Sequence, residues 1–127
     1  MIDRFDPYIG LIVVRATIEG PDGQWSVRLA LDTGATVTTI QTAVLVAIGY
    51  DPAASVDRLS MTTGSGVEYV ARLPIRRIEA LGRERADFPV VAHTLPPSAT
   101  VDGLLGLDYM RGHVLTVDFP RGVVTLA

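Results

Sequence analysis

The chain is organised around one stretch, Leu29-Ala30-Leu31-Asp32-Thr33-Gly34-Ala35-Thr36. In it, an apolar strand runs directly into an acidic residue, a threonine and a glycine. A carboxylate is unusual at the end of an apolar strand, because burying a charge costs several kcal/mol unless the charge is paired or neutralised. Two interpretations are open at this point. Asp32 is either a functional carboxylate or part of an ordinary Asp-Thr-Gly turn.

A second segment favours the functional interpretation. It reads Asp102-Gly103-Leu104-Leu105-Gly106-Leu107-Asp108. Together the two segments resemble the aspartic proteases of the retropepsin and pepsin type. In that family the Asp-Thr/Ser-Gly loop carries the catalytic carboxylate, and the later apolar-apolar-Gly segment passes behind the loop and holds it in place. The resemblance covers most of the chain, from around Tyr8 onward.

The resemblance implies a role for each residue of the two segments. Asp32 would be the catalytic residue, Thr33 would bond across a dimer, and Gly34 would let the backbone approach the substrate closely. A glycine-rich flap over residues 62–68 would close on bound peptide. The substrate-binding residues would be Ala35 on the floor of the site and, on the flap, Thr63, Gly64, Ser65 and Gly66. The residues that support the catalytic loop would be Leu104, Leu105 and Gly106.

One carboxylate is not enough to hydrolyse a peptide bond with activated water. The water has to lose a proton to one group while the carbonyl oxygen gains a proton from another. Two carboxyl groups about 3 Å apart do both, because like charges so close cannot both ionise and the pair holds one proton. The chain has one Asp-Thr-Gly motif, so the second Asp32 has to come from a second copy related by two-fold symmetry. The expected dimer interface is formed by the β-prone ends of the chain, residues 2–5 and 123–126.

The predicted function is therefore that of a homodimeric aspartic endopeptidase acting on protein or peptide substrates, with no cofactor and no metal. Two alternatives stay open: the same barrel used as a non-catalytic peptide-binding or dimerisation module, and a purely structural Asp-Thr-Gly turn. Thr36 and Leu107 stand where retroviral enzymes have Asp and Arg. These differences favour the cellular, bacterial or pepsin-type members of the clan.

Composition excludes several other classes of protein. The chain of 127 residues is 48% hydrophobic, has a net charge of −3 and contains neither lysine nor cysteine. Residues 1–127 are expected to form one domain. The eleven arginines are scattered along the sequence and form no basic cluster of the kind that binds nucleic acid. Without cysteine there is no disulfide or thiol nucleophile, and the beginning of the sequence does not resemble a signal peptide. We expect a cytoplasmic protein with no membrane span.

The remaining chemistry-bearing residues are interpreted as structural. His93 and His113 lie far apart and match no metal-ligand pattern, so each is interpreted as a surface or core residue. Asp108 and Asp118 lie beside the closing strands and are expected to cap or pair with backbone there. Trp25 is expected to be a packing residue.

Apolar alternation and turn residues predict a closed, mostly β barrel of the acid-protease type, with one short internal helix and one near the C-terminus. Pro89 is expected to mark a bulge or an edge. The predicted strands are residues 9–19, 25–31, 36–40, 58–61, 67–72, 74–81, 85–93, the Gly-Leu-Leu-Gly segment, 114–119 and 123–126. The predicted helices are residues 41–48 and 108–111, and the turns lie at residues 20–23, 62–66, 82–84 and 120–122.

Overall fold

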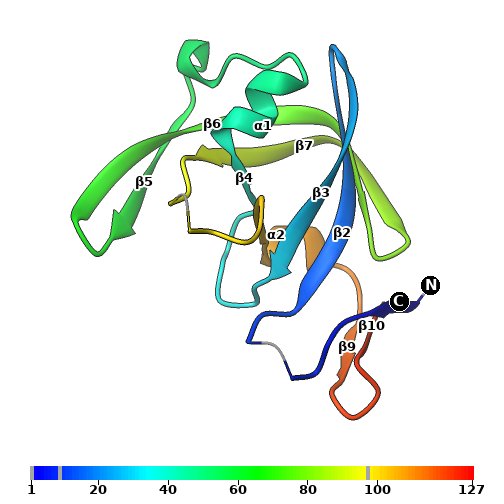
Figure 1. Ribbon diagram of the computed structural model, residues 1–127. Helices are drawn as coiled ribbons and strands as arrows, with labels where there is room; N and C mark the ends of the chain where they lie inside the picture. The colour runs from blue at the N-terminus through cyan, green and yellow to red at the C-terminus, as the bar shows by residue number, and fades with distance from the viewer. Residues whose placement is uncertain (1, 9, 97) are drawn as a thin grey trace.

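The computed structural model describes residues 2–8, 10–96 and 98–127. Its main elements are strands, with two short α-helices and one 3-10 helix (Figure 1). The strands are β1 (Ile2–Arg4), β2 (Val13–Gly20), β3 (Gly23–Leu31), β4 (Thr39–Gln41), β5 (Arg58–Thr63), β6 (Gly66–Ala80), β7 (Arg83–His93), β8 (Gly103–Leu105), β9 (Leu115–Asp118) and β10 (Val123–Leu126). The helices are α1 (Thr42–Ala47), η1 (Pro52–Ala54) and α2 (Leu107–Met110).

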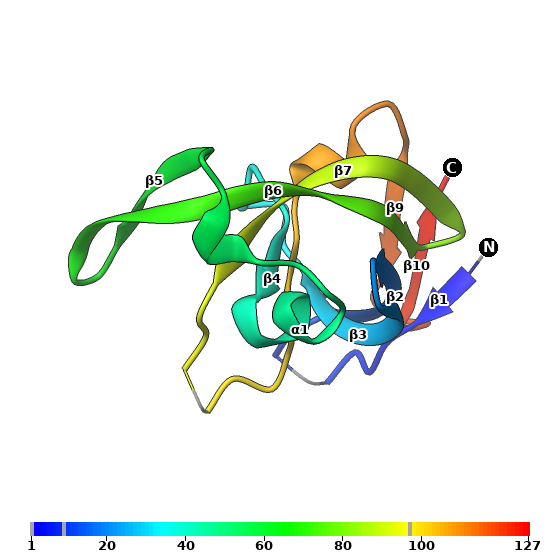
Figure 2. The same ribbon diagram turned by 90° about the horizontal axis from the view of Figure 1, so that it is seen from above.

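A closed barrel forms the centre of the molecule. The larger sheet has the order β2-β3-β8-β4-β7-β6-β5, and β2 also pairs with β6. Among the described residues, six strands therefore close on themselves, while β5 pairs only with β6 at the outside. The β5–β6 hairpin projects from the barrel in both views (Figures 1 and 2). The predicted barrel with a short internal helix and a short helix near the C-terminus is confirmed.

The first hairpin follows from its sequence pattern. Gly20 pairs with Gly23 across the predicted turn, and alternation along β3 buries Val27 and Leu29. Strand β2 begins at Val13, later than expected, and Ile9 lies outside the described residues. The interpretation of Trp25 as a packing residue is wrong, because 47% of its surface is exposed. It lies near the free end of the hairpin, where the first four positions of β3 are all exposed.

Strand β6 joins two predicted strands into one of 15 residues. Pro74 of β6 lies opposite Pro89 of β7 in a continuous register, so Pro89 is not at a bulge; the other alternative, an edge, is confirmed locally. β6 pairs with β5 only up to Ala71, and β7 pairs with β4 only from Val91. The two prolines therefore occupy positions where the outer side of each strand has no neighbouring strand, and no ladder bond is lost there.

Tyr109 of α2 connects the helix to the barrel. Its side chain is fully buried. The hydroxyl accepts a hydrogen bond from the Ala80 amide at 3.0 Å and faces the carbonyl oxygens of Ala80 and Arg83 at 2.7 and 2.5 Å. Burial raises the pKa of the Tyr109 hydroxyl, so that the neutral, donating form is favoured. The turn held by Tyr109 begins one residue earlier than predicted, at Leu81, whose φ of 55° is left-handed.

The chain ends lie side by side in a second sheet of order β1-β10-β9 (Figure 1). β10 is its middle strand, and Val124 and Leu126 of β10 are buried in the core. The two terminal segments predicted to form a dimer interface therefore pair with each other inside one chain. Within the described residues, β1 and β9 are the outer strands of this sheet.

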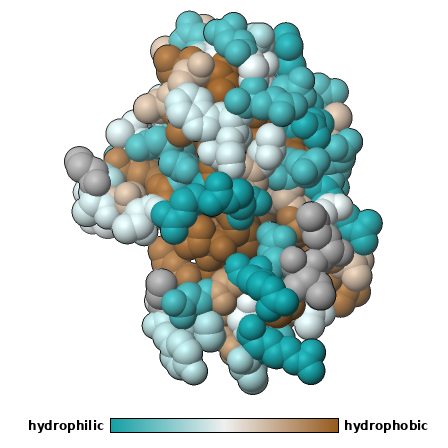
Figure 3. Space-filling view, turned by 45° about the vertical axis from the view of Figure 1, so that its right-hand side comes forward, coloured by the Kyte–Doolittle hydropathy of each residue, from teal (hydrophilic) through white to brown (hydrophobic). Residues whose placement is uncertain are grey.

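A cavity of about 450 Å³ lies between β1 and the beginning of β2. Apolar residues such as Phe5 and Val13 line it together with charged residues such as Arg15 and Arg28. Figure 3, which brings forward the side that carries the chain ends, shows a hydrophobic area flanked by hydrophilic side chains. Of the helices in the described part of the chain, none has the length and apolar character needed to cross a membrane.

Candidate active site

Asp32 follows directly after the last residue of β3. The Leu31 amide donates to the Ile12 carbonyl at 2.8 Å, and the Asp32 amide donates to the Leu105 carbonyl at 3.0 Å. The backbone then turns, and the Ala35 amide donates to the Asp32 carbonyl at 3.1 Å. Asp32 is half-buried. Its position is therefore set by strands on both sides, and its side chain is at the surface of the barrel.

Gly34 orients the Asp32 carboxylate. Its amide donates to Oδ1 of Asp32 at 2.9 Å. A Cβ on Gly34 would lie 3.1 Å from that same oxygen, a tight contact. Among the described residues, no group donates to Oδ2 of Asp32. The loop therefore holds one carboxylate oxygen and leaves the other available.

Thr33 and Ala35 complete this loop. Thr33 is exposed, and its side chain has no hydrogen-bond partner in the described part of the chain. Ala35 is half-buried, and its carbonyl accepts a hydrogen bond from the Leu107 amide at 2.8 Å. The structure thus brings the predicted catalytic loop and the predicted support segment into direct contact.

The support segment passes very close to the loop. β8 runs parallel to β3 and antiparallel to β4, so it lies between the strand before Asp32 and the strand after it. A Cβ on Gly106 would lie 2.7 Å from the Val37 carbonyl oxygen and 2.9 Å from that of Ala35. A Cβ on Gly103 would overlap the Thr39 carbonyl. Glycine is needed at both positions because another backbone occupies the space. The sequence singled out Gly106 but not Gly103.

Thr38 and Asp108 form a connection that the sequence analysis did not identify. The buried Thr38 donates its hydroxyl to Oδ1 of Asp108 at 2.7 Å and its amide to Oδ2 at 3.0 Å. The Thr38 hydroxyl also accepts a hydrogen bond from the Gly106 amide at 3.1 Å. Asp108 was expected to pair with backbone, and it does so with Thr38 and Tyr109. The only signal for Thr38 was its place in a β-branched run.

The predicted flap is the tip of the β5–β6 hairpin. Gly64 and Ser65 form its turn, and Gly66 has a left-handed φ of +123°. The backbone of Thr63 pairs with Gly66, but its side chain lies outside what the structure describes. The tip lies away from the end of β3 in both views (Figures 1 and 2). The structure therefore does not bring the flap residues to Asp32, and their contact with substrate stays a prediction.

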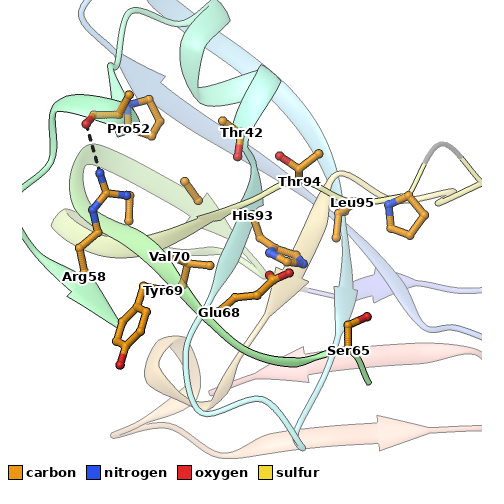
Figure 4. A pocket seen from close by; sticks show the side chains of 14 residues that line it. Thr42, Pro52, Arg58, Ser65, Glu68, Tyr69, Val70, His93, Thr94 and Leu95 are labelled. Atoms are coloured by element: carbon orange, nitrogen blue, oxygen red, sulfur yellow. Dashed lines mark hydrogen bonds between the residues drawn. The ribbon is translucent and has the colours of Figure 1, made fainter. Parts of the chain in front are cut away.

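A pocket of about 720 Å³ lies below this hairpin. Its walls come from the hairpin, from the beginning of α1, from η1 and from the segment that follows β7 (Figure 4). Its charged residues are Glu68 and Arg58, and His93 and Tyr69 are its other ionisable residues. We call it the flap-base pocket.

Comparisons with known proteins agree with this geometry. The family model described as "Aspartyl protease" matches residues 14–109, which is most of the chain. Among solved structures, a retropepsin-like aspartic protease from Rickettsia conorii superposes with a TM-score of 0.74 at 16% sequence identity, covering 99% of this chain and 88% of that one. A search of curated proteins gave no match. The matched segment contains both the Asp32 loop and the β8 segment behind it. The chain therefore belongs to the aspartyl protease family and has the retropepsin-like fold.

Proposed function

We propose that this aspartic protease hydrolyses peptide bonds at an active site assembled from two copies of the chain, each supplying one Asp32. The observation that carries the proposal is the half-site geometry. A single Asp-Thr-Gly loop is braced by β8 and presents one carboxylate at the surface of the barrel. A lone carboxylate cannot serve as acid and base at once, whereas a symmetric pair can.

In the proposed reaction a water molecule lies between the two carboxyl groups, which together hold one proton. One carboxylate takes a proton from the water as the water oxygen bonds to the peptide carbonyl carbon. The protonated partner gives its proton to the carbonyl oxygen. The tetrahedral intermediate then collapses: the carboxyl group that took the water proton gives it to the amine nitrogen as the C–N bond breaks. The other carboxylate takes a proton from a hydroxyl of the intermediate, so that the pair again holds one proton. The Gly34 amide holds one oxygen of Asp32, which leaves the other for the water.

The substrate would lie extended between the β5–β6 hairpin and the floor of the barrel near Ala35, adding a strand through main-chain hydrogen bonds. We propose that Thr63, Gly64, Ser65 and Gly66 cover it from above. For this, the hairpin has to move toward the end of β3. Its sparse support favours such a movement, because β5 pairs only with β6.

Surface features near the chain ends support a dimer. Tyr8, Leu11 and Phe119 are exposed large apolar side chains, and Phe119 packs edge-on against Phe5. The outer strands β1 and β9 offer unpaired backbone to a second copy. Thr33 is exposed beside Asp32, which would allow it to contact the corresponding residue of a partner.

An Asp32→Asn variant tests the catalytic assignment. The protein is incubated with an unbiased peptide library between about pH 4 and 7, and products are read by mass spectrometry. Asp51→Asn is the matched control, because Asp51 is exposed and its side chain makes no cap hydrogen bond. Asp32→Asn should lower cleavage by roughly a thousandfold or more while Asp51→Asn leaves it unchanged. Cleavage that survives Asp32→Asn would refute the assignment. Peptide binding by a wild-type protein that never cleaves would favour the non-catalytic module.

A further inference from the structure

The flap-base pocket carries an uncompensated acidic group. Glu68 points into it from β6, and His93, at the end of β7, points toward Glu68 from the opposite wall (Figure 4). Glu68 has neither a hydrogen bond nor an ion pair with any described residue, and it is exposed to solvent. Small apolar side chains, including Val70 and Ala92, make up much of the remaining wall.

Arg58, the basic residue of the same pocket, is hydrogen-bonded to the backbone. Arg58 lies at the other end of the pocket from Glu68, and its guanidinium donates to the Ala53 carbonyl at 3.1 Å (Figure 4). The Glu68 end of the pocket thus offers a carboxylate acceptor beside apolar walls. Such an arrangement suits a long side chain with an apolar stem and a cationic end, which is the chemistry of arginine and lysine.

The position of the pocket relates it to the peptide path. From the strand that carries Asp32, the sheet runs β3-β8-β4-β7 to the strand that ends in His93. Neighbouring strands lie about 4.8 Å apart, so these three steps cover about 14 Å. In register, Ala92 of the pocket lies level with Leu29, three residues before Asp32, which adds about 10 Å along the strands at about 3.3 Å per residue. The pocket is therefore about 17 Å from Asp32 along the sheet, which an extended peptide spans in about five residues.

We propose that the flap-base pocket is a distal specificity site that takes a basic side chain of the substrate peptide, with Glu68 as the residue that selects it. The proposal rests on the proposed peptidase function. It adds a preference that the Asp32 loop cannot supply. Because Glu68 is on the hairpin and His93 is on the barrel, a bound side chain would also contact both parts of the site.

The test compares matched peptides in the wild-type, Glu68→Gln and Glu68→Lys proteins. A peptide that the wild-type protein cleaves is synthesised with arginine, or with its neutral isostere citrulline, at each position up to seven residues from the cleaved bond. The measured quantity is the ratio of kcat/KM for the two peptides at about pH 7, where a glutamate is ionised and an imidazole is mostly neutral. Glu79→Gln, on the same strand but facing Arg77, is the control. Binding to the Asp32→Asn protein is measured in parallel by fluorescence anisotropy.

The wild-type protein should prefer arginine over citrulline roughly five-fold or more at one position distant from the cleaved bond. Glu68→Gln should bring that ratio to near one, Glu68→Lys should invert it, and Glu79→Gln should leave it at the wild-type value. Cleavage with a ratio unaffected by Glu68→Gln would overturn the specificity site and leave the peptidase function standing. A Glu68-dependent arginine preference in binding, without any cleavage, would support the site and refute the peptidase function.

Discussion

Replacing Thr38 by valine tests the connection between the loop after Asp32 and helix α2. Valine keeps the shape of the side chain and removes only the hydroxyl. That hydroxyl donates to Oδ1 of Asp108 at 2.7 Å and accepts from the Gly106 amide at 3.1 Å, in a position with no solvent exposure. The substitution therefore removes a charge-assisted hydrogen bond and also leaves a buried amide without an acceptor.

Both losses lower the free energy of unfolding of the Thr38→Val protein. Losing a hydrogen bond to a charged group costs about 1.5–3 kcal/mol, and an unsatisfied buried amide costs about 1–3 kcal/mol. We expect Thr38→Val to lower the free energy of unfolding by about 3 kcal/mol, a large part of the roughly 5–15 kcal/mol typical of a domain. With an m value of about 1.5–2 kcal/mol per M, the urea midpoint should fall by about 1.5–2 M.

Urea denaturation followed by circular dichroism measures this shift, with Thr38→Ser as the control. Serine keeps the hydroxyl and loses one methyl group, so it should cost only about 1 kcal/mol. A valine variant as stable as the serine variant, with an unchanged m value, would mean that the hydroxyl does not connect the two segments as described.

Three further predictions follow from individual residues. Gly66→Ala should destabilise the β5–β6 hairpin, seen as faster amide hydrogen exchange there, and lower turnover, because a φ of +123° strains any residue with a Cβ; Gly64→Ala meets open space and should leave hydrogen exchange in the hairpin unchanged. Burial raises the pKa of Asp3 above its usual 3.8, so the folded state binds more protons than the unfolded state just above that value, and stability is lost as the pH rises through the folded pKa. Asp3→Asn should accordingly raise the neutral-pH urea midpoint above that of the wild type, and this gain should vanish under strongly acidic conditions. Pepstatin-type transition-state mimics should inhibit cleavage while EDTA does not; inhibition by EDTA with pepstatin inert would contradict a carboxylate pair.

Much of the barrel could be predicted because its strands carry local signals. Alternation indicated the buried face of β3, and the Asp-Thr-Gly loop together with the Gly-Leu-Leu-Gly segment indicated which strands meet behind Asp32. Alternation indicates which side of a strand faces inward, but it does not indicate how far a hairpin extends beyond the barrel. For this reason Trp25 was expected to pack in the core, although it is largely exposed. The sequence left a bulge and an edge open at Pro89, because the choice depends on where the neighbouring strand β4 ends.

The less predictable parts of the site depend on contacts between distant segments. The Thr38–Asp108 contact joins residues far apart in sequence, and although Asp108 ends the segment that resembles the protease family, nothing in the sequence pairs it with Thr38. His93 was interpreted as structural because a single histidine carries no pattern; only the folded chain places it opposite Glu68 (Figure 4). The pairing of the two chain ends with each other was missed because a β-prone terminal segment does not specify its partner.

The two-copy active site is the central claim, and specific activity measured against protein concentration, together with sedimentation at the same concentrations, tests it most directly. The full chain has to be used, because removing β10 would take Val124 and Leu126 out of the core. The account predicts that activity per chain falls as dilution converts dimer to monomer. A strictly monomeric protein with concentration-independent specific activity would contradict it.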